Sequence, residues 1–163
     1  MLIRLKNKEK LIIDDFIFKC CIGKKGVKKH KIEGDNSTPK GIFTIGTLYY
    51  RKDRVKKPNT NLKIKIIKPN IGWCNETKHK LYNKEISSQE KIHHEKLYRK
   101  DHKYDYLLVI NYNTKKTIAN KGSAIFIHLT KNYYPTAGCI ALKKKDFLIL
   151  LKLINKKTKI KTF

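Results

Sequence analysis

The stretch GSAIFIHLTKNYYPTAGCIAL, residues Gly122 to Leu142, carries the strongest structural and chemical signal in the sequence. An apolar run predicts a strand that delivers His128, a polar loop with a proline turn follows, and a second apolar run begins at Cys139. An imidazole can take the proton of a thiol, and the thiolate that results is a strong nucleophile. The stretch therefore predicts two neighbouring strands that present a His–Cys pair.

Gly138 stands directly before the thiol. Glycine adopts backbone conformations that other residues avoid, and it lets a second chain or a ligand approach closely. The amides of Gly138 and Cys139 are therefore candidates to bind an oxyanion during acyl transfer. A buried cysteine is often chemically inert, so simple packing of this pair stays open as the alternative at this point.

The composition favours one folded unit with a strongly basic surface. At 163 residues with 40% hydrophobic side chains, the chain is predicted to form a single domain over residues 1–163. It has 39 Lys and Arg against 13 Asp and Glu, a net charge of +26. This excess suits a polyanionic partner, such as nucleic acid, anionic lipid or an acidic cell-wall polymer. Compositional bias is the competing explanation, because the excess is mostly Lys and accompanies many Ile and Asn residues.

The cysteine pattern indicates neither zinc nor a disulfide framework. The four cysteines are Cys20, Cys21, Cys74 and Cys139. They form no CxxC pair, and no second pair of ligands stands at zinc-like spacing, so we expect no metal site. The first three are predicted to be small core residues, and Cys139 is predicted to be the reactive one.

Most of the remaining chain predicts short strands. The segments with strand character are residues 2–6, 11–22, Ile42–Gly46, Lys63–Ile67, Leu107–Tyr112 and Ala124–Leu129. An apolar stripe at helical spacing predicts one amphipathic helix over Lys144–Asn155. Residues 69–105 lack steady periodicity and are interpreted as a long, partly helical excursion. Residues 156–163 alternate weakly and are interpreted as a last edge strand.

Several motifs, taken in order, resemble the L,D-transpeptidase (YkuD-type) catalytic domain family. The stretch SAIFIHL…PTAGCIAL is similar to the family's catalytic segment, in which a strand His precedes a Gly-Cys nucleophile. The segment EGDNSTPKGIF at residues 33–43 matches its N-terminal element. Shorter matches are WCN at Trp73, YN at Tyr82, LYRKD at Leu97, YD at Tyr104 and GSA at Gly122. The resemblance covers residues 20–155.

The resemblance implies a mainly β fold, a sandwich-like arrangement of mixed sheets with a few short helices, including one near the C-terminus. It implies acyl transfer on peptidoglycan stem peptides, with Cys139 as the nucleophile and His128 as general base and acid. The thioester on Cys139 would form with release of D-Ala. An amine would then resolve it to give a crosslink, or water would hydrolyse it. Neither metal nor organic cofactor is implied.

Two positions depart from the family's usual pattern. Many members have Ser or His where this chain has Ala137, and Arg where it has Ala141. The missing arginine removes one contact for a substrate carboxylate. Arg99, Arg51 and Arg54 are the candidates to replace it.

Further candidates for substrate binding are Trp73, Tyr82, Arg99 and Tyr134, each weighed against a core role. The implied partner is the stem peptide, and the Lys excess favours nonspecific contact with anionic polymers. We expect no specific nucleic-acid ligand.

Members of the family work outside the cytoplasmic membrane, which predicts a periplasmic or cell-envelope location. Residues 11–23 carry Asp14 and Asp15 within their apolar run and do not read as a signal peptide or a membrane span. A cytoplasmic location is the alternative. The second hypothesis for function is a basic, non-catalytic binding module for nucleic acid or anionic cell-wall polymer on the same scaffold.

Overall fold

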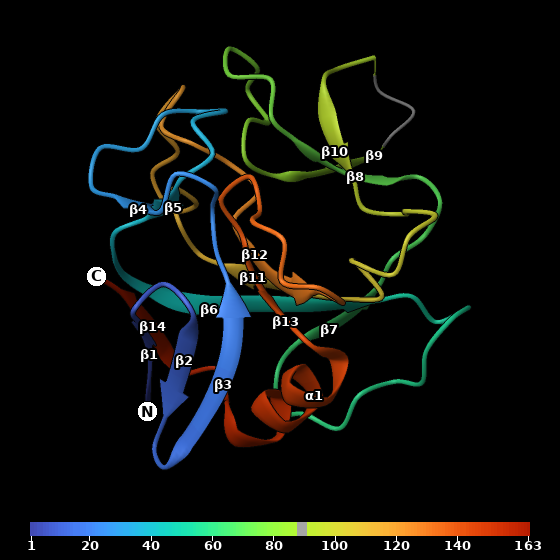
Figure 1. The fold of residues 1–163 in the computed structure, drawn as a ribbon. Coiled ribbons are helices and arrows are strands. Elements are labelled where there is room, and N and C mark those ends of the chain that lie inside the picture. Colours follow the sequence, from blue (N-terminus) through green and yellow to red (C-terminus); the bar gives the residue numbers. More distant parts are fainter. Residues whose placement is uncertain (88–90) are drawn as a thin grey trace.

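The computed structural model describes residues 1–87 and 91–163, and strands predominate in it (Figure 1). The strands are β1 (Leu2–Lys6), β2 (Lys10–Ile13), β3 (Phe16–Cys21), β4 (Val27–Lys28), β5 (Thr38–Pro39), β6 (Gly41–Tyr50), β7 (Ile64–Ile66), β8 (Ile71–Cys74), β9 (Glu85–Ser87), β10 (His94–Lys96), β11 (Tyr106–Ile110), β12 (Phe126–Leu129), β13 (Ile140–Leu142) and β14 (Lys159–Thr162). The helix is α1 (Lys144–Leu153). The mainly β prediction, with mixed sheets and a helix near the C-terminus, is confirmed.

The main sheet closes on itself. Its strand order is β11-β12-β13-β3-β2-β1-β14-β6-β7, and β11 also pairs with β6. The long strand β6 joins the ends, because one part of it pairs with β14 and another with β11 across a register shift. The result is a closed, barrel-like sandwich with β7 as a side branch. Both parallel and antiparallel pairs occur, as in the β12–β13 and β1–β2 ladders.

Strand β12 has apolar neighbours on both of its faces. Ile127 and Leu129 belong to the main core inside the closed sheet, together with residues of α1. Phe126 belongs to a second core on the opposite face, which also contains Trp73 and Cys139. Because side chains alternate along a strand, His128 shares the outer face with Phe126. All four residues of β12 are therefore buried.

The second core is covered by the small sheet β10-β8-β9, which lies above the main sheet in Figure 1. The Trp73 ring of β8 packs edge-on against Phe126, with the ring centroids 5.2 Å apart. This covering sheet comes from residues 69–105, so the prediction of a partly helical excursion there is wrong. The segment binds the outer face through extended backbone, and its described residues contain no helix.

The C-terminal elements follow the sequence pattern with two differences. Helix α1 ends two residues before the predicted limit of Asn155 and buries Phe147, Leu150 and Leu151. Strand β14 exists, but it pairs with β1 on one side and β6 on the other, so the prediction of an edge strand is wrong. Within residues 1–87 and 91–163, helical structure is confined to the ten residues of α1, which falls short of a bilayer span.

Candidate active site

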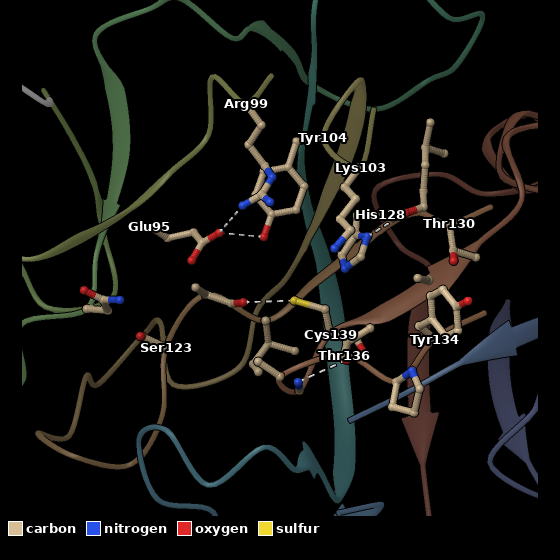
Figure 2. A pocket seen from close by; sticks show the side chains of 18 of the residues that line it. Glu95, Arg99, Lys103, Tyr104, Ser123, His128, Thr130, Tyr134, Thr136 and Cys139 are labelled. Atoms are coloured by element: carbon tan, nitrogen blue, oxygen red, sulfur yellow. Dashed lines mark hydrogen bonds and ion pairs between the residues drawn. The ribbon is translucent and has the colours of Figure 1, made fainter. Parts of the chain in front are cut away.

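His128 and Cys139 lie on one face of two neighbouring parallel strands. His128 of β12 pairs in register with Ala141 of β13, and paired residues present their side chains to the same face. Cys139 precedes Ala141 by two residues and therefore shares that face. Both side chains line one cavity of about 550 Å³, whose wall also includes Glu95 and Tyr104 (Figure 2).

The Cys139 thiol is buried and hydrogen-bonded to backbone. It donates to the Ala124 carbonyl at 3.2 Å and accepts from the Phe126 N–H at 3.4 Å. In Figure 2 the sulfur points toward the carbonyl, with the His128 imidazole on the other side of the cysteine. Burial raises the pKa of the thiol to about 12, although the Phe126 N–H lowers it. The structure thus holds Cys139 as a neutral thiol turned away from its expected base.

The ring of His128 is held in one tautomer. Nδ1 lies 2.9 Å from the Leu129 carbonyl, and because a carbonyl only accepts, Nδ1 carries the hydrogen. Nε2 is then the nitrogen with a free lone pair, as a general base requires. Burial, together with the positive charges of Lys103 and Arg99, lowers the pKa of His128 to about 4. The Tyr104 ring packs against the imidazole at 68° with its centroid 5.4 Å away.

These two pKa values describe a resting, uncharged pair. Burial raises the pKa of the Cys139 thiol and lowers the pKa of the His128 imidazole, so both shifts oppose transfer of the proton from sulfur to nitrogen. The thiolate–imidazolium pair is therefore scarce in this state. Rotation about the Cα–Cβ bond of Cys139 and a cationic environment are both needed to populate it.

The turn before Cys139 depends on Gly138. Its φ is +145°, and a Cβ there would lie 2.8 Å from the Ser37 carbonyl oxygen. Thr136 closes the turn, because its hydroxyl accepts from the Gly138 N–H at 3.1 Å and donates to the Cys139 carbonyl at 2.6 Å. Thr38 donates to the Gly138 carbonyl at 2.9 Å. The Gly138 N–H must leave Thr136 before it can bind an oxyanion.

A charged wall of the cavity lies near the Cys139 thiol. Tyr104 donates to Glu95 at 2.9 Å, and the Arg99 guanidinium lies 3.5 Å from the same carboxylate. Arg99 also forms a paired contact with Asp101, at 3.0 and 2.6 Å. Figure 2 shows Glu95, Arg99 and Tyr104 grouped on the side of the cavity nearest the thiol. The wall therefore offers charges of both signs to a substrate.

Of the three arginines proposed to replace the missing one, Arg99 lines the cavity. Arg51 binds Asp53 at 2.6 Å and stacks on the Tyr98 ring at 3.5 Å from its centroid. Arg54 binds Asp105 at 3.2 Å. Arg51 and Arg54 therefore hold the 98–105 segment against the end of β6. Lys103, which sequence reasoning did not single out, is a further cation of the cavity wall.

The aromatic candidates divide into two groups. Tyr134 is 75% exposed and lines the cavity mouth. Trp73 and Tyr82 are buried behind the wall: Trp73 Nε1 donates to Asn83 at 2.9 Å, and the Tyr82 hydroxyl donates to Glu33 and accepts from the Gly122 N–H at 3.0 Å. In the described chain these two support the cavity and do not line it.

Sequence reasoning did not assign a site role to several residues that the structure brings to the site, namely Lys31, Asn83, Glu95, Lys103, Tyr104 and Thr136. Asn83, Tyr104 and Thr136 lie inside segments that the resemblance already matched, and Glu95 stands close before one, which was the available signal. Lys31 is one lysine among many in the sequence, and only its burial in the structure distinguishes it.

The comparison with known families agrees with this geometry. The profile of the YkuD family, described as the L,D-transpeptidase catalytic domain, matches residues 3–161. No curated protein sequence matches the chain significantly. Because the profile spans nearly the whole chain, the protein belongs to the L,D-transpeptidase family.

Proposed function

We propose that the protein is a cysteine acyltransferase that acts on peptidoglycan stem peptides. The observation that carries the proposal is the shared cavity of Cys139 and His128, whose side chains lie on the same face on either side of the β12–β13 pairing. The family supports this type of activity in general.

In the first half of the reaction, the thiol rotates from the Ala124 carbonyl toward Nε2 of His128 and transfers its proton there. The sulfur attacks the carbonyl carbon at the L-centre of the third residue of the stem. The bond from that carbon to the nitrogen of the terminal D-Ala breaks, and His128 returns the proton to the departing amine. A thioester on Cys139 remains.

In the second half, an amine of another stem, or water, attacks the thioester carbonyl. The carbon–sulfur bond breaks, His128 takes a proton from the attacking group, and the sulfur recovers it. An amine gives an L,D-crosslink and water gives a shortened stem. Since this substrate lies outside the cytoplasmic membrane, the proposal includes work in the periplasm or cell envelope.

The charges of the cavity support a peptide with ionised ends. Lys103, Lys131 and Arg99 lie in its wall, as does Glu95. Carboxylates of the stem have cationic partners there, and a diamino-acid ammonium has an acidic one. Ala141 leaves the carboxylate contact to these residues, since alanine has no charge to supply.

The test is intact-protein mass analysis after incubation with a carbapenem and, separately, with a stem tetrapeptide with and without an acceptor amine. The proposal expects a covalent adduct and released D-Ala for the native protein, and neither for Cys139→Ala. Cys21→Ala is the matched control, because this second buried thiol contacts the Tyr134 carbonyl at 3.2 Å and should leave the adduct unchanged.

An unmodified native protein that releases no D-Ala from any stem peptide would overturn the proposal. An adduct that persists in Cys139→Ala would overturn the choice of nucleophile. Salt-sensitive binding of anionic polymer without an adduct would favour the basic binding module instead.

A further inference from the structure

A buried lysine ammonium lies beside the nucleophile turn. The side chain of Lys31 is 3% exposed, although lysine is rarely buried to this degree. It belongs to the wall of the same cavity as Cys139. Its Nζ lies 3.6 Å from where a Cβ on Gly138 would stand, which places the ammonium against the residue that precedes the thiol.

Two glycines give this lysine its place. A Cβ on Gly122 would lie 2.8 Å from Cε of Lys31 and 3.1 Å from its Cδ. Gly122 has a φ of +102°, and Gly138 also has a positive φ. The aliphatic stem of Lys31 therefore runs through space that side chains at these two positions would fill. The absence of side chains at these two positions leaves room for Lys31, and its ammonium lies beside the turn that precedes the thiol.

The ammonium has one anionic partner. Nζ of Lys31 lies 2.7 Å from Oδ1 of Asp35, and the Ile32 and Ser37 N–H groups donate to the same carboxylate at 3.0 Å. Partial burial raises the pKa of Asp35, but Lys31 and these N–H groups outweigh it and lower the pKa overall. The carboxylate is thus ionised, and the Lys31 Nζ that contacts it lies beside the Gly138 turn.

A cation in addition to a protonated His128 would stabilise an anionic sulfur at this site. An imidazolium at position 128 is disfavoured by burial and by the nearby Lys103 and Arg99 charges. Glu95, which lines the same cavity, disfavours an anionic sulfur on Cys139, whereas Lys31 favours one. Among the described groups that act on the thiol, Lys31 supplies the positive charge from the side of the Gly138 turn.

We propose that the buried Lys31 ammonium is the counter-charge that stabilises the Cys139 thiolate once the proton of the thiol has passed to His128. The S–H bond breaks, the proton goes to Nε2 of His128, and Lys31 stays protonated throughout. Asp35 holds the ammonium in place, and its negative charge weakens the electrostatic effect of Lys31 on the Cys139 sulfur. The inference rests on the proposed function only in taking Cys139 as the nucleophile.

Glu95, Tyr104 and Lys31 interact electrostatically with the Cys139 thiol, and His128 lines the same cavity. Only Lys31 and its partner Asp35 are changed in the test, so the other three act as constants. The field argument then predicts shifts of opposite sign. Removing the ammonium makes the thiolate harder to form, and removing the Asp35 charge makes it easier.

The experiment measures the rate of Cys139 alkylation by iodoacetamide between pH 6 and pH 10, with peptide mapping by mass to separate the four cysteines. Lys31→Met should slow alkylation at pH 8 at least tenfold and move the profile to higher pH. Asp35→Asn should speed it at least threefold and move the profile to lower pH. Lys31→Arg should stay within threefold of the native protein.

Lys28→Met is the matched control, because Lys28 lies 3.9 Å from the same carboxylate but its side chain is 50% exposed. It should stay within twofold of the native rate. A purely structural ion pair predicts a different result: Lys31→Met and Asp35→Asn both lower the unfolding temperature, and neither moves the pH profile of folded protein. That result, or shifts of the same sign in both variants, overturns the inference.

If Lys31→Met does not fold, Asp35→Asn decides alone: faster alkylation supports the inference, and an unchanged or slower rate overturns it. The assay reads the thiol and not substrate turnover. If the protein releases no D-Ala but Lys31→Met and Asp35→Asn still shift the alkylation profile in opposite directions, the result counts against the proposed function and supports the role of Lys31.

Discussion

Asn83 connects the covering sheet to the segment that leads into β12, and removing its amide should destabilise the protein strongly. The residue is 3% exposed. Its Oδ1 accepts from Trp73 Nε1 at 2.9 Å and from the Ala124 N–H at 3.1 Å. Its Nδ2 donates to the Tyr112 and Asn113 carbonyls at 2.9 and 2.8 Å. Asn83→Ala removes all four hydrogen bonds at once.

The expected loss follows from this count. Each of these bonds contributes about 1 kcal/mol, so the four together give about 4 kcal/mol. Asn83 also has a φ of +58°, where alanine costs about 1 kcal/mol more than glycine. We therefore expect Asn83→Ala to lose about 5 kcal/mol of unfolding free energy and Asn83→Gly about 4 kcal/mol.

Urea unfolding followed by far-UV circular dichroism measures these losses. For a chain of this length, a loss of 4 kcal/mol lowers Tm by roughly 8–16 °C. Asn111→Ala is the matched control, because this half-buried side chain donates one bond, to Thr44 at 2.9 Å, and should lose about 1 kcal/mol. The reasoning is refuted if Asn83→Ala costs no more than Asn111→Ala.

Three further predictions concern pH and packing. Because burial lowers the pKa of His128 from 6.5 to about 4, the folded protein binds fewer protons than the unfolded chain in this range. Unfolding free energy should therefore fall by about 3 kcal/mol as the pH drops from about 6.5 to 4 in urea titrations, and His128→Gln should remove most of that slope. Gly138→Ala should abolish acylation and lower the unfolding free energy by at least about 2 kcal/mol. Gly34→Ala is the control: it has open space around it and should lower the unfolding free energy by only about 1 kcal/mol. Equal losses in the two variants would contradict the crowding argument. Phe147→Ala should lower the unfolding free energy by about 3–5 kcal/mol in the same assay. Leu148→Ala should lower it clearly less, because Leu148 is only partly buried. The reverse order would contradict the burial pattern of α1.

The strands and the His–Cys pair were predictable because their signals are local. Apolar runs of four to six residues predict β11 and β12, and the spacing of Phe147 and Leu151 predicts α1. The His128 and Cys139 pair followed from two strands joined by a loop, and the structure places both in one cavity. The resemblance added the fold and the chemistry.

The covering sheet was missed because its strands, three or four residues each, are too short to show alternation. Their stability comes from packing on the outer face of β11 and β12, which is a long-range property. The pairing of β14 with β6 is hidden for the same reason, since partners such as Thr162 and Gly41 stand far apart in the chain. The burial of Lys31 depends on both Gly122 and Gly138. Lys31 is far from both glycines in the chain, and no local sequence pattern predicts that it contacts them.

The closed sheet has a consequence for the order of folding. The sheet cannot close until β14 (Lys159–Thr162) pairs with β1 on one side and β6 on the other. This strand is among the last parts of the described chain to leave the ribosome. Until then, β1 and the first half of β6 present open strand edges that invite pairing with other chains. We therefore expect ring closure to be a late step that waits for β14, and a nascent chain arrested before β14 to need protection by a chaperone.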